Sequence, residues 1–439
     1  MREWKRNTPH TSAVETYAGE RADVAVHGYT YLDRSYRYSV RTRSLTFWTS
    51  RYEVQLGPEG YGVAIASKGY VHVHLPADAQ LGTFADQILV TLRSAWLGFE
   101  AGALLAAPAK TFLEKATSSD DAATLKPLFT PLFEPSETAS LDGTSESKSC
   151  AAIPLPGIAL RPPAHPRQPV HHEPKHANSS ARPHEGTSSG RNARRYVILN
   201  VLDNVRSENR FWKFDRASGK WSLHQTLRGE GVAQISAGGV NGDKTDDIWT
   251  TSSSYTQPTT YSIAHAEKPS KQDRLKALPA FFDSSDLESQ QFDATSLDGT
   301  RVPYFLVSKK GAKFDSSTPT LLYGYGGFEI SMTPGYAATV GVGWLESGGA
   351  YAVANIRGGG EFGPRWHQAA LKEKRHKAYE DFEAVAADLV KRGVTSPHLL
   401  GCQGGSNGGL LTGNMLARSP HLFGAIVIQV RSRSRSSYV

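Results

Sequence analysis

Residues 404–408 carry the pattern with the clearest chemical meaning in this sequence, Gly-Gly-Ser-Asn-Gly, which has the form G-x-S-x-G. An apolar run at 399–403 precedes it, and a helical pattern over 408–417 follows it. A serine on such a sharp strand-to-helix turn presents its hydroxyl above the sheet, and the glycines allow the turn. The helix N-terminus favours negative charge that develops there. This context predicts Ser406 as the nucleophile of an acyl-transfer reaction.

The pattern alone does not identify a nucleophile, because G-x-S-x-G occurs again at 186–190 inside a polar tract. Only the copy at 404–408 lies between a strand and a helix. The alternative for this copy is a glycine-rich turn whose serine has no chemical role.

Two further glycine clusters follow apolar runs. Residues 323–328, Tyr-Gly-Tyr-Gly-Gly-Phe, lie where a hydrolase sheet places the second half of its oxyanion hole, and a tyrosine hydroxyl there could donate to an oxyanion. A tight aromatic turn is the alternative. Residues 358–363 fit G-x-G-x-x-G, but a dinucleotide site needs an acid after a second strand. Glu380 and Asp381 fall within an expected helix instead, so we reject a nucleotide site.

The C-terminal part of the chain alternates strands and helices from about residue 290. The helix over 379–389 has apolar residues at three- and four-residue steps, and Gly393 is placed to cap it. This alternation predicts a parallel sheet covered by helices. The expected strands are 319–323, 350–356, 399–403 and 423–430.

The N-terminal part, residues 1–285, reads mainly as short strands and turns. Segments 41–52, 69–75 and 196–202 alternate polar and apolar residues and are rich in β-branched and aromatic side chains. Turn signals such as 241–243 separate them. Many short strands with recurring turns are typical of a sandwich, a barrel or a propeller.

The tract 147–195 is rich in Pro, His, Ser and Arg and has no apolar periodicity after its first residues. We expect a disordered insertion there, because the tract cannot bury enough apolar surface to offset its ordering entropy. Its histidines have no fixed metal-ligand spacing, so we expect neither a metal nor a cofactor.

Composition narrows the class of protein. The net charge of +7 is concentrated in 151–195, with seven basic and two acidic residues, and in 431–439, with three basic residues and no acid. The remainder is close to neutral, so we expect no nucleic-acid partner. Without a long apolar run or a signal sequence, we expect neither a membrane partner nor secretion. Cys150 and Cys402 are too few for a disulfide framework, which favours the cytoplasm.

Three segments together resemble the prolyl oligopeptidase family of serine peptidases. They are 322–328 (LYGYGGF), 354–361 (ANIRGGGE) and 404–411 (GGSNGGLL), in this order and at similar spacings. The resemblance is clear over 283–430 and weaker towards the N-terminus. It implies a seven-bladed β-propeller with an α/β-hydrolase domain, and cleavage of short peptides, mostly after proline.

The resemblance implies roles for four residues. Ser406 is the expected nucleophile, the Asn407 backbone N–H and the Tyr325 hydroxyl are the expected oxyanion donors, and Phe328 is expected to line the pocket for the proline ring. It also implies a domain division into a partial propeller over 1–285, interrupted by the insertion, a partial hydrolase domain over 286–430 and a disordered basic tail over 431–439.

The sequence lacks two members of the expected triad. After Ser406 it has no Asp or Glu, and its one histidine, His421, is too close in sequence to occupy the late loop of a general base. We therefore expect a fragment truncated at both ends, with about five blades at roughly 40–50 residues per blade. An open propeller and an open sheet edge predict marginal stability.

Two functions remain open. The first is a serine peptidase of this family that forms an acyl-enzyme on Ser406, although this polypeptide is expected to be inactive without the triad acid and histidine. The second is a non-catalytic relic whose propeller surface binds peptides or partners. We expect a short peptide as the ligand and a monomer.

Overall fold

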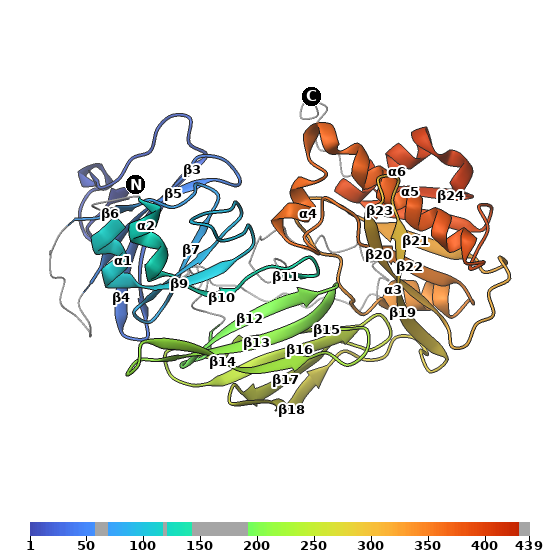
Figure 1. The fold of residues 1–439 in the computed structure, drawn as a ribbon, viewed down its shortest axis with the longest axis horizontal. Helices are drawn as coiled ribbons and strands as arrows, with labels where there is room; N and C mark the ends of the chain where they lie inside the picture. The colour runs from blue at the N-terminus through green and yellow to red at the C-terminus, as the bar shows by residue number, and fades with distance from the viewer. Residues whose placement is uncertain (58–68, 117–120, 143–191, 430–439) are drawn as a thin grey trace, which may run out of the picture.

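The computed structural model describes residues 1–57, 69–116, 121–142 and 192–429. Antiparallel sheets make up the N-terminal part of these ranges, and a mixed sheet with helices makes up the C-terminal part (Figure 1). The basic tail, Cys150 and most of the expected insertion lie outside the described residues.

Four antiparallel sheets of four strands each follow one another along residues 25–277. In each sheet, strands that are consecutive in sequence pair with each other, and the four sheets lie along an arc (Figure 1). Their strands are β3 (Ala25–Asp33), β4 (Tyr36–Ser44), β5 (Ser50–Leu56) and β6 (Val71–Val73); β7 (Gln80–Phe84), β8 (Gln87–Thr91), β9 (Leu104–Pro108) and β10 (Thr130–Phe133); β11 (Ala139–Leu141), β12 (Tyr196–Asp203), β13 (Arg206–Asp215) and β14 (Lys220–Arg228); and β15 (Ala233–Gly239), β16 (Asp247–Ser254), β17 (Thr260–His265) and β18 (Lys268–Ala277).

The remaining N-terminal elements are short. They are the strand pair β1 (Arg2–Glu3) and β2 (Val14–Glu15), the helices α1 (Ala109–Ala116) and α2 (Ala122–Leu125), and the 3-10 turns η1 (His10–Ser12) and η2 (Lys126–Leu128).

Each four-stranded sheet packs against the next through apolar side chains that point alternately to its two faces. On β8, Ile88 and Val90 pack with Tyr38 of the first sheet, whereas Leu89 faces the other way and packs with Val197 of the third sheet. The third and fourth sheets share a further apolar cluster. Because side chains on a strand alternate between faces, one strand can supply both interfaces.

The number of sheets differs from the expected five blades. The length-based estimate treated residues 1–24 and the helical connection 109–128 as part of blades, whereas the described residues form four four-stranded sheets. That these sheets belong to an incomplete propeller stays a prediction.

The C-terminal part is built on a six-stranded sheet with the order β19-β20-β22-β21-β23-β24. The four expected strands are present and run parallel as β22, β21, β23 and β24. Two antiparallel strands, β19 and β20, extend the sheet, so it is mixed rather than parallel throughout. The bounds are β19 (Leu287–Thr295), β20 (Arg301–Lys309), β21 (Thr320–Gly324), β22 (Ala350–Ala354), β23 (Leu400–Gly405) and β24 (Ala425–Gln429).

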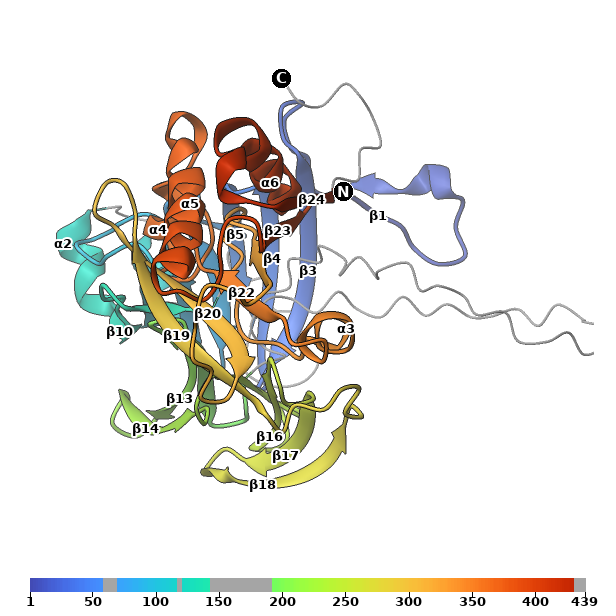
Figure 2. The same cartoon turned by 90° about the vertical axis from the view of Figure 1, so that its right-hand side faces the viewer.

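Helices cover this sheet as the periodicity predicts. The apolar residues of the expected helix, including Phe382 and Leu389, lie on α5 and pack with Leu411 of α6 against the strands. Figure 2 shows α5 and α6 beside each other along the sheet. No helix in the described ranges is long and apolar enough to cross a membrane. The helical segments are α3 (Ala338–Val340), η4 (Gly341–Leu345), α4 (Pro364–Gln368), η5 (Lys372–Lys374), α5 (His376–Lys391), α6 (Asn407–Arg418) and η6 (Pro420–Leu422).

Two sequence expectations are wrong in detail. Segment 41–52 is not one strand, because β4 ends at Ser44 and β5 begins at Ser50. The Thr46 hydroxyl accepts backbone N–H bonds at 3.1 Å and so closes a turn between them. Residues 192–195 also belong to the fold rather than to the insertion, since Asn192 is buried and its Oδ1 accepts from Ile198 N at 3.0 Å.

The two parts of the molecule contact each other through one set of strand connections. Gln291 Nε2 donates to the carbonyl of Asn204, between β12 and β13, at 2.8 Å. Tyr336 N donates to Ser253 Oγ, near the end of β16, at 3.0 Å. This end of the four-stranded sheets therefore faces the α/β part.

Candidate active site

Ser406 lies at the turn between β23 and α6 in a backbone conformation that ordinary residues avoid. Its φ is 53° and its ψ is −114°. The residue is exposed, and its side chain makes no capping hydrogen bond to α6 although it occupies the N-cap position. Strained residues of this kind concentrate at functional sites. The structure thus presents the Ser406 hydroxyl to solvent at the edge of the sheet.

The neighbouring glycines make this turn sterically possible. A Cβ atom on Gly404 would collide with the carbonyl oxygen of Gly408. A Cβ atom on Gly408 would lie 2.5 Å from the carbonyl oxygen of Gly324, at the end of β21. The glycines of the motif therefore allow β23, α6 and β21 to approach one another closely.

The Tyr325 loop lies beside Ser406 because their strands are neighbours. Strands β21 and β23 run parallel with Tyr323 paired to Gln403, so their carboxyl ends meet at one edge. Neighbouring strands lie about 4.8 Å apart. A Cβ atom on Gly408 would also lie 3.6 Å from Tyr325 Cα. The two loops expected to form one site are in contact.

Asn407 connects the two loops through its side chain. Its Nδ2 donates to the carbonyl oxygen of Tyr325 at 2.7 Å, and the amide packs where Gly327 has no side chain. As the first residue of α6, Asn407 has no acceptor for its backbone N–H within the helix. The side chain holds the opposite loop in place, and the oxyanion role of the backbone N–H stays a prediction.

Phe328 continues the same loop with an exposed ring. Half of its surface is accessible, and its φ of 53° is unusual for an aromatic residue. Glu329, which follows, forms an ion pair with Arg93 from the four-stranded sheets. The loop that begins at Tyr325 is thus anchored by α6 at one end and by the N-terminal part at the other.

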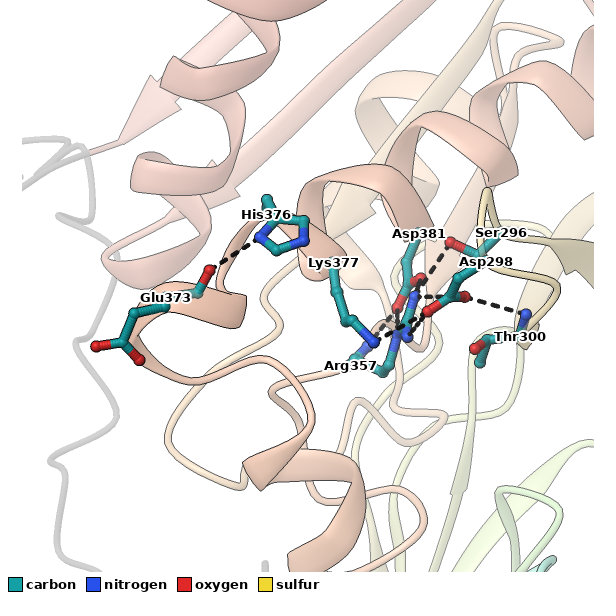
Figure 3. A network of polar contacts seen from close by, with 8 residues as sticks. All are labelled: Ser296, Asp298, Thr300, Arg357, Glu373, His376, Lys377 and Asp381. Carbon is teal, nitrogen blue, oxygen red and sulfur yellow. Dashed lines mark hydrogen bonds and ion pairs between the residues drawn. The ribbon is translucent and has the colours of Figure 1, made fainter.

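A buried ion-pair network supports this edge from behind (Figure 3). Arg357 follows β22, and its guanidinium donates to Asp381 of α5 at 2.6 Å and to Asp298 at 2.6 Å. Lys377 also pairs with Asp298, at 3.2 Å. The Arg357 hydrogen bonds hold the pKa of Asp298 well below its usual range. The network fixes the turn after β22, where Gly358 packs against the carbonyl oxygen of Gly326.

Glu361 is a second buried acid behind the site. Its carboxyl accepts from Met332 N at 2.9 Å and from Asn355 Nδ2 at 3.3 Å, and its residue is 1% exposed. Burial raises the pKa of Glu361 to about 7, although these hydrogen bonds lower it. The carboxyl connects the segment after Phe328 to the turn after β22.

His421 does not join this site. It lies on η6, beyond the far end of the 12-residue helix α6. At 1.5 Å per residue, this helix separates it from Ser406 by about 18 Å. The 33 residues after Ser406 contain no Asp or Glu.

Comparison with known proteins identifies the family. Residues 339–433 match the model of the prolyl oligopeptidase family. An uncharacterized peptidase of Sinorhizobium fredii, y4nA, is 36% identical over 434 residues, which make up 97% of this chain and 51% of that protein. Residues 339–433 of this chain therefore match the prolyl oligopeptidase family, and nearly the whole chain is similar to about half of a peptidase. The resemblance inferred from the three motifs is confirmed.

A second sequence relative and a solved structure are also similar to this chain. The prolyl endopeptidase of Elizabethkingia miricola is 37% identical over 206 residues, covering 47% of this chain and 28% of that protein. A solved post-proline cleaving enzyme from Rickettsia typhi aligns with a TM-score of 0.74 at 26% identity, over 97% of this chain and 53% of that one. The chain spans about half the length of the Sinorhizobium fredii relative and of the solved enzyme.

Sequence reasoning missed the residues that hold the site together. It assigned only the backbone of Asn407, and it gave no role to Arg357, Glu361 or Arg93. A charged residue directly after a mainly apolar segment, as Arg357 follows 350–356, is a usable signal for a buried ion pair. Nothing in the local sequence marks Arg93 as the partner of Glu329.

Proposed function

We propose that this chain carries the nucleophile half of a prolyl oligopeptidase family serine peptidase that hydrolyses short peptides, mostly after proline. The observation that carries the proposal is the strained, exposed Ser406 in a turn that contacts the Tyr325 loop. We assign residues 1–285 to an incomplete β-propeller, 286–430 to part of an α/β-hydrolase domain and 431–439 to a tail, with 147–191 as an insertion.

In the proposed reaction, Ser406 Oγ attacks the peptide carbonyl carbon and its proton passes to a base. The carbonyl oxygen becomes an oxyanion, which accepts hydrogen bonds from Asn407 N and from the Tyr325 hydroxyl. Collapse of this intermediate expels the amine, protonated by the same base, and leaves an ester on Ser406. Water then hydrolyses the ester.

Phe328 supports the proline preference. An exposed aromatic ring beside the nucleophile provides an apolar surface for the pyrrolidine ring of a substrate. Two similar proteins are named for cleavage at proline, a prolyl endopeptidase and a post-proline cleaving enzyme. A short peptide is therefore the proposed ligand.

The 439-residue polypeptide by itself is proposed to be inactive. Proton removal from Ser406 needs a base, and the residues that follow Ser406 supply only the distant His421. A non-catalytic protein that binds peptides on its sheets is the second candidate, favoured by this same missing base.

A boronic acid analogue of glycyl-proline tests the proposed nucleophile without requiring turnover. The boron accepts a lone pair from a serine oxygen and becomes tetrahedral, while the serine proton passes to water. We expect boron NMR to show a tetrahedral adduct with the wild-type chain and none with Ser406→Ala. Ser188→Ala, which changes the other G-x-S-x-G serine, should leave the adduct unchanged. An adduct that persists in Ser406→Ala, or no adduct with the wild-type chain, would contradict the proposal.

Turnover tests the second part of the proposal. A chromogenic Gly-Pro substrate should be hydrolysed no faster by the purified chain than by buffer. Hydrolysis that disappears in Ser406→Ala would show that the chain does contain a base, and would exclude the non-catalytic candidate.

A further inference from the structure

A basic cavity lies at the ends of the four-stranded sheets. Its volume is about 670 Å³, within the range of roughly 300–1,000 Å³ that is usual for small-molecule sites. Residues from all four sheets or their flanking segments line it. They are Arg34, Ser35, Phe84, Arg194, Arg195, Lys213, Phe214, Arg216, Asp243, Lys244 and Asp246.

The cavity is remote from the candidate active site. Arg34 and Ser35 form the turn before β4, whereas Trp48, after the end of β4, contacts His367 of the α/β part with ring centroids 5.5 Å apart. Strand β12 likewise runs from the cavity to the interface with the α/β part. It begins after Arg195, which lines the cavity, and ends before Asn204, which Gln291 contacts. A nine-residue strand such as β4 spans about 30 Å. The cavity therefore lies at the opposite end of the sheets from Ser406.

Two of the lining arginines form ion pairs with aspartates and connect neighbouring segments around the cavity. Arg34 is buried, forms an ion pair with Asp33 and donates to the carbonyl oxygens of Arg194 at 2.9 Å and Ala193 at 2.6 Å. Arg195 pairs with Asp246 at 2.5 Å. These contacts join three sheets into a rigid frame.

Four other lining cations have no ion-pair partner among the described residues: Arg194, Lys213, Arg216 and Lys244. Asp243 is the only lining acid not already paired with a lining arginine side chain, and it accepts from Arg34 N at 2.7 Å. The cavity therefore holds an excess of positive charge. Like charges gathered in one cavity repel one another, and a bound anion relieves that repulsion.

We propose that this cavity binds a small anion with two or more linked phosphate groups. Lysine and arginine form charge-assisted hydrogen bonds to phosphate oxygens, and four unpaired cations match a compact ligand of high charge better than a single carboxylate. The proposed site is separate from Ser406 and does not rest on the peptidase function.

Calorimetry with inorganic tripolyphosphate tests the proposal on the full chain. We expect one ion bound per chain, with an affinity that falls as salt increases. Lys213→Ala combined with Lys244→Ala should weaken binding about tenfold or more, because two charge-assisted contacts are lost. The matched control is Lys271→Ala with Lys276→Ala on β18, two exposed lysines outside the cavity, and it should change the affinity less than about twofold.

Three results would overturn the proposal: no binding, several ions bound per chain, or unchanged affinity in the Lys213/Lys244 variant. The last is expected if the basic residues of 151–191 or 431–439 bind the anion instead. Ser406→Ala should bind tripolyphosphate as tightly as wild type, which separates this test from that of the peptidase. Replacing tripolyphosphate by ATP shows whether a nucleoside adds affinity.

Discussion

At the scale of single residues, the site depends on contacts that hold two loops against each other. Ser406 keeps its unusual backbone conformation because glycines surround it and because Ser406 N donates to Gln429 O of β24 at 2.7 Å. Asn407 then connects the Ser406 turn to the Tyr325 loop. The local strand-to-helix motif made Ser406 a candidate, whereas the roles of Asn407 and Tyr325 came from the family resemblance and stay predictions. The side-chain role of Asn407 was not identifiable from sequence, since it depends on a loop 82 residues away.

Asn407→Ala removes the hydrogen bond to the Tyr325 carbonyl but keeps the backbone N–H. We expect the boronate adduct to weaken about tenfold, because the opposite loop loses its anchor and leaves a carbonyl unpaired. Titration monitored by boron NMR measures the change. Asn414→Ala is the matched control, since Asn414 lies on the same helix, is half-buried and donates to Leu410 O of that helix rather than to another loop. Equal effects of the two substitutions would contradict the proposed role.

Glu361 gives the fold a dependence on pH. Burial raises its pKa from about 4.5 to about 7, so the folded chain holds this proton more tightly than the unfolded chain. Its contribution to stability is therefore complete below about pH 4.5 and is lost as pH rises to about 7. We expect Glu361→Gln to remove a decrease of about 2–3 kcal/mol in the free energy of unfolding between about pH 5 and pH 8.

Denaturant unfolding at several pH values measures this difference. Glu346→Gln, an exposed carboxylate in the same part of the chain, is the control and should keep the wild-type pH dependence. A Glu361→Gln variant with the same pH dependence as wild type would show that the buried carboxyl does not titrate in this range.

At the scale of secondary-structure elements, apolar periodicity predicted the C-terminal part well. It identified β21 to β24, α5 and α6, because buried strands and an amphipathic helix each leave a regular pattern. It failed at 41–52, where a threonine side chain makes a turn without Gly, Pro or Asn. It also gave no sign of the Arg357 network, whose partners lie 24 and 59 residues away.

Arg357→Ala should destabilise the packing of α5 behind the site. Asp381 is fully buried, and loss of its partner leaves a charge in the core, which costs about 3–5 kcal/mol. Denaturant unfolding measures the loss. Arg418→Ala, which breaks an exposed pair with Glu383, should cost only about 0–1 kcal/mol. A cost for Arg357→Ala as small as that of the control would mean that the network does not hold the turn.

At the scale of the whole molecule, the N-terminal sheets contact the loop that carries Tyr325 and Phe328. Arg93 pairs with Glu329, next to Phe328, and its guanidinium lies 4.0 Å from the centre of the Trp48 ring. Both side chains of the ion pair are nearly buried, at 11% and 12% exposed. The sequence could not predict this pair, because the two residues belong to different parts of the fold.

A double-mutant cycle tests this connection. Arg93→Met and Glu329→Gln should each weaken the boronate adduct several-fold, and the double variant should be little worse than either one, because both remove the same contact. The expected coupling is about 1–2 kcal/mol for a nearly buried pair. Additive effects would show that the two residues act independently and that the sheets do not position the Phe328 loop.

The central claim is that Ser406 and Tyr325 act on one carbonyl group, and Tyr325→Phe tests it most directly. The tetrahedral boronate has a hydroxyl where the oxyanion would form, so loss of the Tyr325 hydroxyl should weaken the adduct about tenfold or more. Tyr323→Phe, two residues earlier on β21, is the matched control and should leave the affinity unchanged. An unchanged adduct in Tyr325→Phe would contradict the account.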